Sequence, residues 1–162
     1  MPPRLELDVT FGARRPWAPR RAEFARWAAA ALADRAPLPR ACAGRVTISI
    51  RVVGAARSRT LNALYRHKNR ATNVLSFGGA GKMPDGSSDL GELVICAPVV
   101  AREACTQGKS AAAHWAHLTV HGVLHLLGFD HDGRGDAQKM EAREIQILDR
   151  LGFSNPYVWP DA

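Results

Sequence analysis

Residues 121–131 read HGVLHLLGFDH and predict a helix that ends in a tight turn. On a helix, His121 and His125 are four residues apart and project from the same face. Gly128 is suited to stop the helix, because glycine tolerates the left-handed conformation that helix ends often need. The chain then turns back and brings His131 to the same point. Three imidazoles leave one position open on a tetrahedral ion, which is the layout of a catalytic zinc site.

The spacing of these residues matches the extended zinc-binding signature of the metzincin peptidases. Those enzymes carry a glutamate directly after the first histidine as general base, whereas this chain has Gly122. The sequence therefore predicts the metal-binding half of such a site without its usual proteolytic base. The alternative is that these histidines are ordinary helix and loop residues. It is disfavoured because three histidines and a glycine rarely coincide at these offsets.

The same predicted helix carries a further histidine, His117, which is four residues before His121 and offers an alternative ligand pair. That pair lacks a third ligand placed by a following turn, so His121 with His125 is preferred. We expect His117 to be a core residue or a hydrogen-bond partner of the site. Asp130 and Asp132 flank His131, and each is either an acceptor that orients a ligand imidazole or a simple turn residue.

The length of 162 residues predicts a single domain with a sizeable core, spanning residues 1–162. A formal net charge of +7 suggests an anionic partner such as RNA, although a solvated basic surface has the same signature. Three cysteines in no metal-ligand spacing fit a reducing compartment. The chain start does not resemble a signal peptide, and no apolar run is long enough to cross a bilayer. The sequence therefore predicts a cytoplasmic protein with no membrane partner.

Hydrophobic periodicity predicts strands alternating with helices. The expected strands are residues 5–9, 45–53, 73–77 and 90–96, and the expected helices are residues 20–34, 58–67, 97–107, 110–127 and 136–151. Ser58 is the expected cap of the second helix, and the glycine-rich stretch Gly78 to Ser88 is an expected mobile loop. The fold class is thus α+β, with a central, mostly four-stranded sheet, about five flanking helices and a metal site at the end of a helix.

A basic block, LNALYRHKNRATNVLSF, covers residues 61–77 and begins as a helix that gives way to a strand. Arginine binds phosphate with a planar, bidentate fork, so this block is a candidate phosphate-binding region. A solvated helix face followed by a core strand is the competing interpretation, and spacing alone favours it slightly. The candidate substrate-binding residues are Arg59, which comes just before this block, and Lys68, Arg70, Asn73 and Ser76 within it.

Together, HGVLHLLGFDH, LNALYRHK, TNVLSF, LGELVIC and the closing LGFSNPY resemble the YbeY-type endoribonucleases of bacterial ribosomal RNA maturation. The resemblance runs from about residue 45 to Tyr157. Three positions differ from the usual pattern of that family: Asn69 and Glu92 replace aspartates, and Ala71 replaces a proline. None of the three is a metal ligand in the family pattern.

The resemblance implies one zinc ion per chain, held by His121, His125 and His131, and a catalytic role for Arg66. It also implies single-strand-specific cleavage of RNA in maturation of the 3′ end of small-subunit ribosomal RNA and in biogenesis and quality control of that subunit. The expected partners are ribosomal RNA, the small ribosomal subunit and its associated factors, but not DNA. The attacking oxygen is either a water molecule or the substrate 2′-hydroxyl, and Glu92 is a weak candidate for general base.

Two other classes of function remain at this stage. A zinc peptidase would need another carboxylate near the metal to replace the glutamate that is absent at Gly122. A noncatalytic, zinc-stabilised module that binds the ribosome would also explain the basic surface, although an open three-histidine site is unusual for a structural metal.

Overall fold

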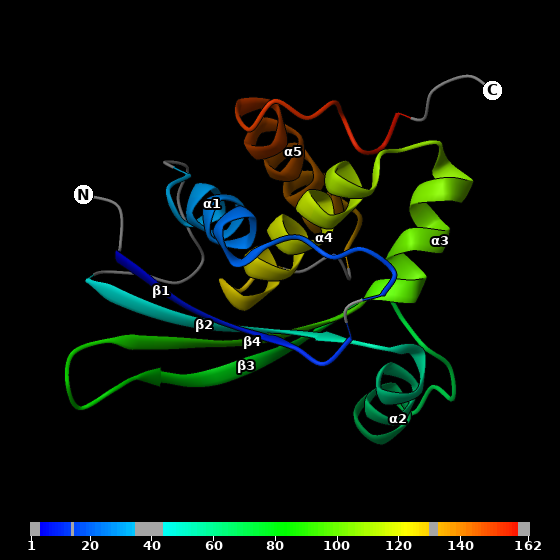
Figure 1. The fold of residues 1–162 in the computed structure, drawn as a ribbon. Helices are drawn as coiled ribbons and strands as arrows, with labels where there is room; N and C mark the ends of the chain where they lie inside the picture. The colour runs from blue at the N-terminus through cyan, green and yellow to red at the C-terminus, as the bar shows by residue number, and fades with distance from the viewer. Residues whose placement is uncertain (1–3, 14, 35–43, 130–132, 159–162) are drawn as a thin grey trace.

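The computed structural model describes residues 4–13, 15–34, 44–129 and 133–158. Its elements follow in the order β1 (Arg4–Phe11), α1 (Arg21–Leu32), β2 (Arg45–Val53), α2 (Ala55–Arg66), β3 (Val74–Lys82), β4 (Ser88–Cys96), α3 (Ala97–Gln107), α4 (Ala111–Leu126) and α5 (Arg134–Arg150). Helices α1, α4 and α5 lie across one face of the sheet, and α2 lies on the other side (Figure 1). The predicted α+β class, with four strands and five helices, is confirmed for these residues.

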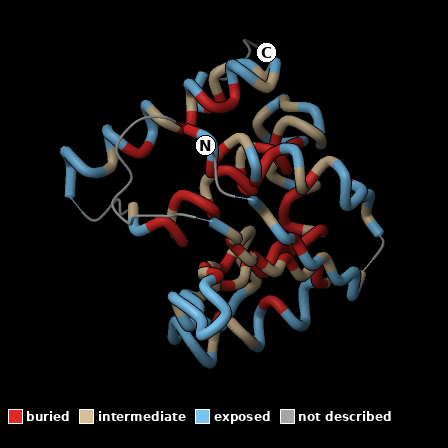
Figure 2. Tube along the Cα trace, turned by 90° about the vertical axis from the view of Figure 1, so that its left-hand side faces the viewer, coloured by how far each residue is buried: buried red, intermediate tan, exposed pale blue. Residues whose placement is uncertain are grey.

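The sheet has the strand order β1-β2-β4-β3. Strands β1, β2 and β4 run parallel, and β3 pairs antiparallel with β4 and forms one edge. Strand β2 shows the alternation that its sequence predicts, because Val46, Ile48, Ile50 and Val52 are buried and join the main core. Figure 2 shows the buried residues gathered in the interior, where helices and sheet meet.

Helix α4 is the central element of the helical layer. It contacts α1, α3 and α5 as well as strands β3 and β4. Ser110 caps its first turn, where the hydroxyl accepts a hydrogen bond from the Ala113 N–H at 3.1 Å. Because a helix surrounded by packed elements has little solvated surface, most of α4 is apolar, and its histidines need polar partners inside the protein.

Two local expectations are wrong. Helix α2 begins at Ala55, so Ser58 lies in its first turn rather than capping it. The buried Ser58 hydroxyl instead bonds the backbone of Thr72, accepting from its N–H at 2.9 Å and donating to its carbonyl at 3.0 Å. The glycine-rich stretch after Phe77 is not a long loop, because β3 continues to Lys82 and pairs with β4 through backbone groups that need no side chains.

None of the helices that the structure describes combines the length and apolar character needed to cross a membrane.

Candidate active site

The end of α4 has the predicted form. The helix stops at Leu126, and Gly128 takes a positive φ of 100°. The Gly128 N–H bonds the His125 carbonyl at 2.9 Å, and the Phe129 N–H bonds the Leu124 carbonyl at 3.1 Å, which closes the last turn. Three further residues of the prediction, the third ligand His131 and its neighbours Asp130 and Asp132, lie outside the described residues.

His121 and His125 face each other on α4. Their Nε2 atoms lie 3.1 Å apart, and both side chains are partly exposed. Two imidazole nitrogens that bind one tetrahedral zinc ion at about 2.0–2.1 Å are separated by ~3.3 Å, so the observed spacing fits a shared ion. The chemistry of this donor pair therefore suits the predicted metal site.

A buried carboxylate on α5 holds this pair from behind. Glu144 has no exposed surface, and its Oε1 accepts a hydrogen bond from His121 Nδ1 at 2.5 Å. An ionised carboxylate only accepts, so Nδ1 carries the proton and Nε2 is left toward His125. Metal-binding histidines usually have such a carboxylate on the second ring nitrogen, which fixes the tautomer and increases basicity.

Two further groups donate hydrogen bonds to Glu144. Its Oε2 accepts from His117 Nε2 at 3.0 Å and from the Tyr157 hydroxyl. Burial alone would raise the pKa of Glu144, but the hydrogen bonds from His117 and His121 outweigh it and lower the pKa to about 2. Burial lowers the pKa of His117 despite its carboxylate partner, and burial together with the Glu144 contact raises that of Tyr157. A charged Glu144 thus accepts hydrogen bonds from a neutral imidazole and a neutral phenol.

The same contacts create a second possible metal group. Ligand atoms of His117, His121 and Glu144 lie within 4.8 Å of one another. In this group Glu144 would itself bind the metal. In a site built on His121 and His125, Glu144 would not touch the metal but would hydrogen-bond to the ligand His121. The His117 Nδ1 atom is buried and has no hydrogen-bond partner among the described residues. The two arrangements share His121 and differ in which neighbouring histidine the metal requires.

A cavity of about 450 Å³ brings the histidines together with the basic block. Its walls come from α4 (His121 and His125), from the first half of β3 and from the last residue of α2, Arg66. Asn73 and Ser76 also line it. Five of the predicted site residues therefore line one cavity. Arg66, Asn73 and Ser76 lie more than forty residues before His121 and His125 in the chain.

Arg66 is held at the rim of this cavity. Its guanidinium donates to the Ser76 carbonyl at 3.0 Å and to the Tyr65 carbonyl at 3.3 Å, and it lies over the Phe77 ring at 5.4 Å. The side chain is nevertheless exposed. A guanidinium has five N–H donors, so donors remain for an anionic substrate in the cavity.

A second carboxylate positions Asn73. The Asn73 amide donates to Glu103 of α3 at 3.1 Å, and Glu103 also accepts from the Nε2 atom of buried His114 at 2.9 Å. Burial raises the pKa of Glu103, but these hydrogen bonds have the larger combined effect and lower it. Glu103 thus pairs with His114, Glu144 pairs with His117 and His121, and Asn73 is fixed on the cavity wall.

The other predicted substrate residues lie nearby but outside the cavity lining. Arg59 donates to the Asn69 side chain at 2.8 Å, while Lys68 and Arg70 are exposed in the connection between α2 and β3. Their role in binding stays a prediction. Glu92 lies on the opposite face of the sheet from the histidines and accepts from Arg51 at 3.0 Å, so its suggested role as general base is not supported.

Gly122 allows α4 to approach β4 closely. A Cβ atom added there would lie 2.7 Å from Cδ2 and 2.9 Å from Cδ1 of the buried Leu93 side chain. A side chain at this position would therefore start toward the sheet and not toward the cavity. The close packing against Leu93 therefore gives a structural reason for the absence of the peptidase glutamate at position 122, in addition to the chemical one.

We expect Gly122→Ala to lower the free energy of unfolding by about 1–3 kcal/mol, because overpacking forces neighbouring groups to shift. Denaturant titration measures this change. Gly135→Ala in the first turn of α5 is the matched control, since a Cβ there meets nothing within 4 Å. Alanine at such a helical site should be neutral or stabilise by up to about 1 kcal/mol. Equal stability of the two variants would contradict the proposed packing of Gly122.

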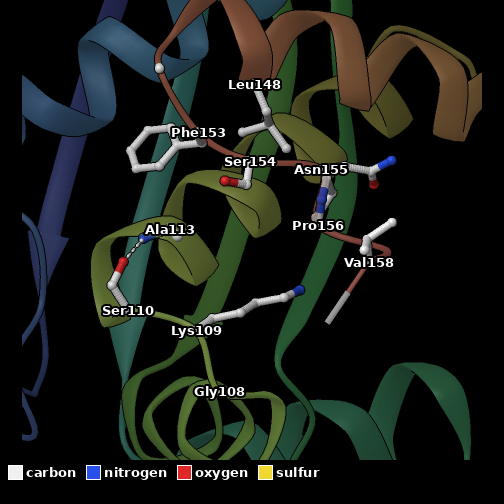
Figure 3. Close-up of a pocket in the computed structure, with 11 residues that line it drawn as sticks. Gly108, Lys109, Ser110, Ala113, Leu148, Phe153, Ser154, Asn155, Pro156 and Val158 are labelled. Carbon is white, nitrogen blue, oxygen red and sulfur yellow. Dashed lines mark hydrogen bonds between the residues drawn. The ribbon is translucent and has the colours of Figure 1, made fainter. Parts of the chain in front are cut away.

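A larger cavity of about 610 Å³ lies near the other end of α4, between its first turn and the segment after α5 (Figure 3). Lys109 and Ser110 line it together with Phe153, Pro156 and Val158. Burial lowers the pKa of Lys109, although Glu103 opposes the shift. No cluster of metal ligands is described there, so the smaller cavity is the better candidate for the active site.

Histidines oriented by a buried carboxylate, opposite an arginine, are typical of metal-dependent enzymes that act on anionic substrates. The sequence profile of the endoribonuclease YbeY family matches residues 18–152, and the chain belongs to this family. Endoribonuclease YbeY of Stenotrophomonas maltophilia is 47% identical over 162 residues, covering 96% of this chain and 95% of that protein. The Nitrosococcus oceani protein is 46% identical over 157 residues, covering 94% of this chain and 97% of that protein.

The fold also has a counterpart among solved structures. The solution structure of TM1509 from Thermotoga maritima aligns with a TM-score of 0.52 at 16% identity, covering 94% of this chain and 99% of that one. This likeness concerns the fold alone.

Proposed function

We propose that the chain is a metal-dependent endoribonuclease that cuts single-stranded RNA in ribosomal RNA maturation. The observation that carries this proposal is the cavity in which Arg66 of α2 meets His121 and His125 of α4. The related proteins that are named endoribonuclease YbeY support the reaction class, and the net charge of +7 suits an anionic substrate.

The proposed cofactor is one zinc ion per chain, with His121, His125 and His131 as ligands. The Nε2 spacing of 3.1 Å and the carboxylate behind His121 support the first two ligands. Zinc would supply Lewis-acid chemistry and a water molecule with a lowered pKa. Glu144 would keep His121 oriented throughout, because its own low pKa leaves it ionised at neutral pH.

Arg66 would bind the scissile phosphodiester and stabilise the negative charge that grows on it in the transition state. Its hydrogen bond to the Ser76 carbonyl and the Phe77 ring beneath it hold the guanidinium at the rim for that role. Asn73 and Ser76 would contact the nucleotide in the cavity. Exposed Lys68 and Arg70, with Arg59, would bind the RNA backbone further out, with an affinity that falls as salt rises.

The proposal is tested with metal-replete protein on structured RNA and on casein. RNA cleavage that His121→Ala abolishes, without casein hydrolysis, supports it. Chelator-sensitive casein hydrolysis in a preparation that does not cut RNA would identify a peptidase. Ribosome binding with neither activity would identify a noncatalytic module. A 2′-deoxy substitution at the scissile nucleotide blocks cleavage if the 2′-hydroxyl attacks and has no such effect if water attacks.

Removal of the metal should lower the melting temperature. A ligand that binds only the folded state stabilises it by about 2.7 kcal/mol when its free concentration is about a hundredfold above its dissociation constant. Elemental analysis should find about one zinc per chain in protein purified without chelator. A protein that contains no metal and takes none up on titration would contradict the site.

We further propose that residues 1–162 act as a single hydrolase domain on the small ribosomal subunit and its associated factors in the cytoplasm. A main hydrophobic core that joins α1, the sheet, α4 and α5 supports the single domain. Co-sedimentation with small subunits, lost at high salt, tests the partner.

A further inference from the structure

A third cavity, of about 380 Å³, opens beside β3, β4 and α2, and we name it the tyrosine groove. The residues that define it for this purpose are Arg51, Arg57, Tyr65, Phe77 and Glu92. It contains no histidine, and apart from Phe77, which supports Arg66, its lining residues have no part in the proposed reaction. Its aromatic and basic side chains raise the question of what it binds.

The tyrosine groove adjoins the histidine cavity across the edge strand β3. Ser76 and Gly78 line the histidine cavity, while Phe77 between them lines the groove. Successive strand residues point to opposite faces, so this strand forms a wall shared by both spaces. Arg66 connects them, because it lines the histidine cavity and lies over the Phe77 ring at 5.4 Å.

The floor of the groove offers an exposed aromatic surface. The Tyr65 and Phe77 rings pack edge to face, with centroids 5.1 Å apart. Tyr65 is 53% exposed, although it sits in a helix whose neighbouring turns pack on the protein. Every nucleic acid base has a π-face, so an exposed ring beside cations suits the stacking of an unpaired base.

The groove also has a cation suited to phosphate. Arg51 is paired with Glu92 at 3.0 Å, which neutralises much of its charge. For Arg57, the described part of the chain includes neither an ion pair nor a hydrogen bond of its guanidinium, and the residue is exposed. A guanidinium with this freedom can bind a phosphodiester with two parallel hydrogen bonds.

We infer that the tyrosine groove holds the single-stranded RNA next to the cleavage site, with a base against Tyr65 and a phosphate at Arg57. This inference rests on the proposed function and adds a substrate subsite to it. The RNA would pass from the histidine cavity over β3 at the Arg66–Phe77 contact. Stacking on Tyr65 requires an unpaired base, so the groove would favour single strands over duplexes without strong sequence preference.

Steady-state cleavage of a single-stranded RNA that extends well beyond the scissile bond tests the groove. Tyr65→Leu should raise KM by about tenfold with little change in kcat, because stacking on one ring accounts for about that affinity. Tyr65→Phe keeps the ring and should retain the KM of the unmodified protein. Leu64→Ala changes an exposed neighbour that lines neither cavity and should have no effect.

Arg57→Gln tests the phosphate contact. It should weaken RNA binding and lower the slope of log affinity against log salt by about one. Arg26→Gln is the charge-matched control on α1, which lies across the sheet from α2 (Figure 1). Helix α2 contributes Arg57 and Tyr65 to the groove.

An unchanged KM in Tyr65→Leu, in a preparation that cuts RNA normally, would overturn the groove and leave the proposed function standing. An equal rise in KM in Tyr65→Leu and Tyr65→Phe would also overturn base stacking. A protein that neither binds nor cuts RNA would overturn both proposals.

Discussion

His125→Ala should abolish metal binding and RNA cleavage together, whereas Arg66→Ala should abolish cleavage and leave the metal in place. The Nε2 atom of His125 lies 3.1 Å from that of His121, in position to share an ion. The Arg66 guanidinium is assigned to the phosphodiester, and loss of one such charge-stabilising group typically lowers kcat by about 10²–10³-fold. Elemental analysis and single-turnover cleavage measure the two effects separately.

His117→Ala distinguishes the two possible metal groups. If His121, His125 and His131 bind the ion, this variant keeps its metal, because the hydrogen bonds of His117 go to Glu144 and Tyr157 and not to the ion. If the ion lies among His117, His121 and Glu144, the variant loses it and His125→Ala retains it.

Full cleavage by Arg66→Ala would show that the role assigned to Arg66 is wrong, whatever the metal content.

The second large effect is expected at Glu144. Glu144→Ala removes the acceptor shared by His117, His121 and Tyr157, and should lower the free energy of unfolding by about 3 kcal/mol even without metal. Loss of a carboxylate that orients a metal ligand typically weakens metal affinity by about 10–100-fold. Thermal unfolding of metal-free protein and zinc titration measure these two contributions.

Glu141→Gln is the matched control for Glu144, one helical turn earlier on the exposed side of α5. It should match the unmodified protein in both measurements. If Glu144→Ala also matched it, the hydrogen bonds of Glu144 would contribute nothing measurable, and the orienting role assigned to this carboxylate would be wrong.

Local spacing predicted the elements that carry the histidines. The four-residue spacing of His121 and His125 and the glycine at position 128 were sufficient to predict the helix and its end, because both features depend on a single turn of backbone. The prediction that Ser58 caps α2 was wrong, because a serine that caps a helix and a serine that bonds a distant backbone have the same local sequence. The prediction of a mobile loop after Phe77 was wrong, because these glycines are held in the sheet by backbone pairing with β4, which their own sequence does not reveal.

Glu144 was missed for a different reason. It is 23 residues from His121, and no local pattern predicts a contact at that separation. A signal was nevertheless present on α5, where Glu144 falls at helical spacing with the buried residues Met140, Ile147 and Leu148. A carboxylate within an apolar stripe is rarely left without a partner, so such a residue is worth pairing with a histidine-rich neighbouring helix.

The hydrogen bond from the Tyr157 hydroxyl to Glu144 has a practical consequence for how this protein is prepared. Segments beyond a last helix are the usual places to trim a chain for crystallisation or to fuse an affinity tag. Here a chain shortened after Arg150 would keep every helix and strand that the structure describes, yet it would lose one of the three donors around Glu144. Any preparation that alters this tail therefore changes the setting of the metal site itself, and metal-binding data should be compared only between proteins with the same C-terminus.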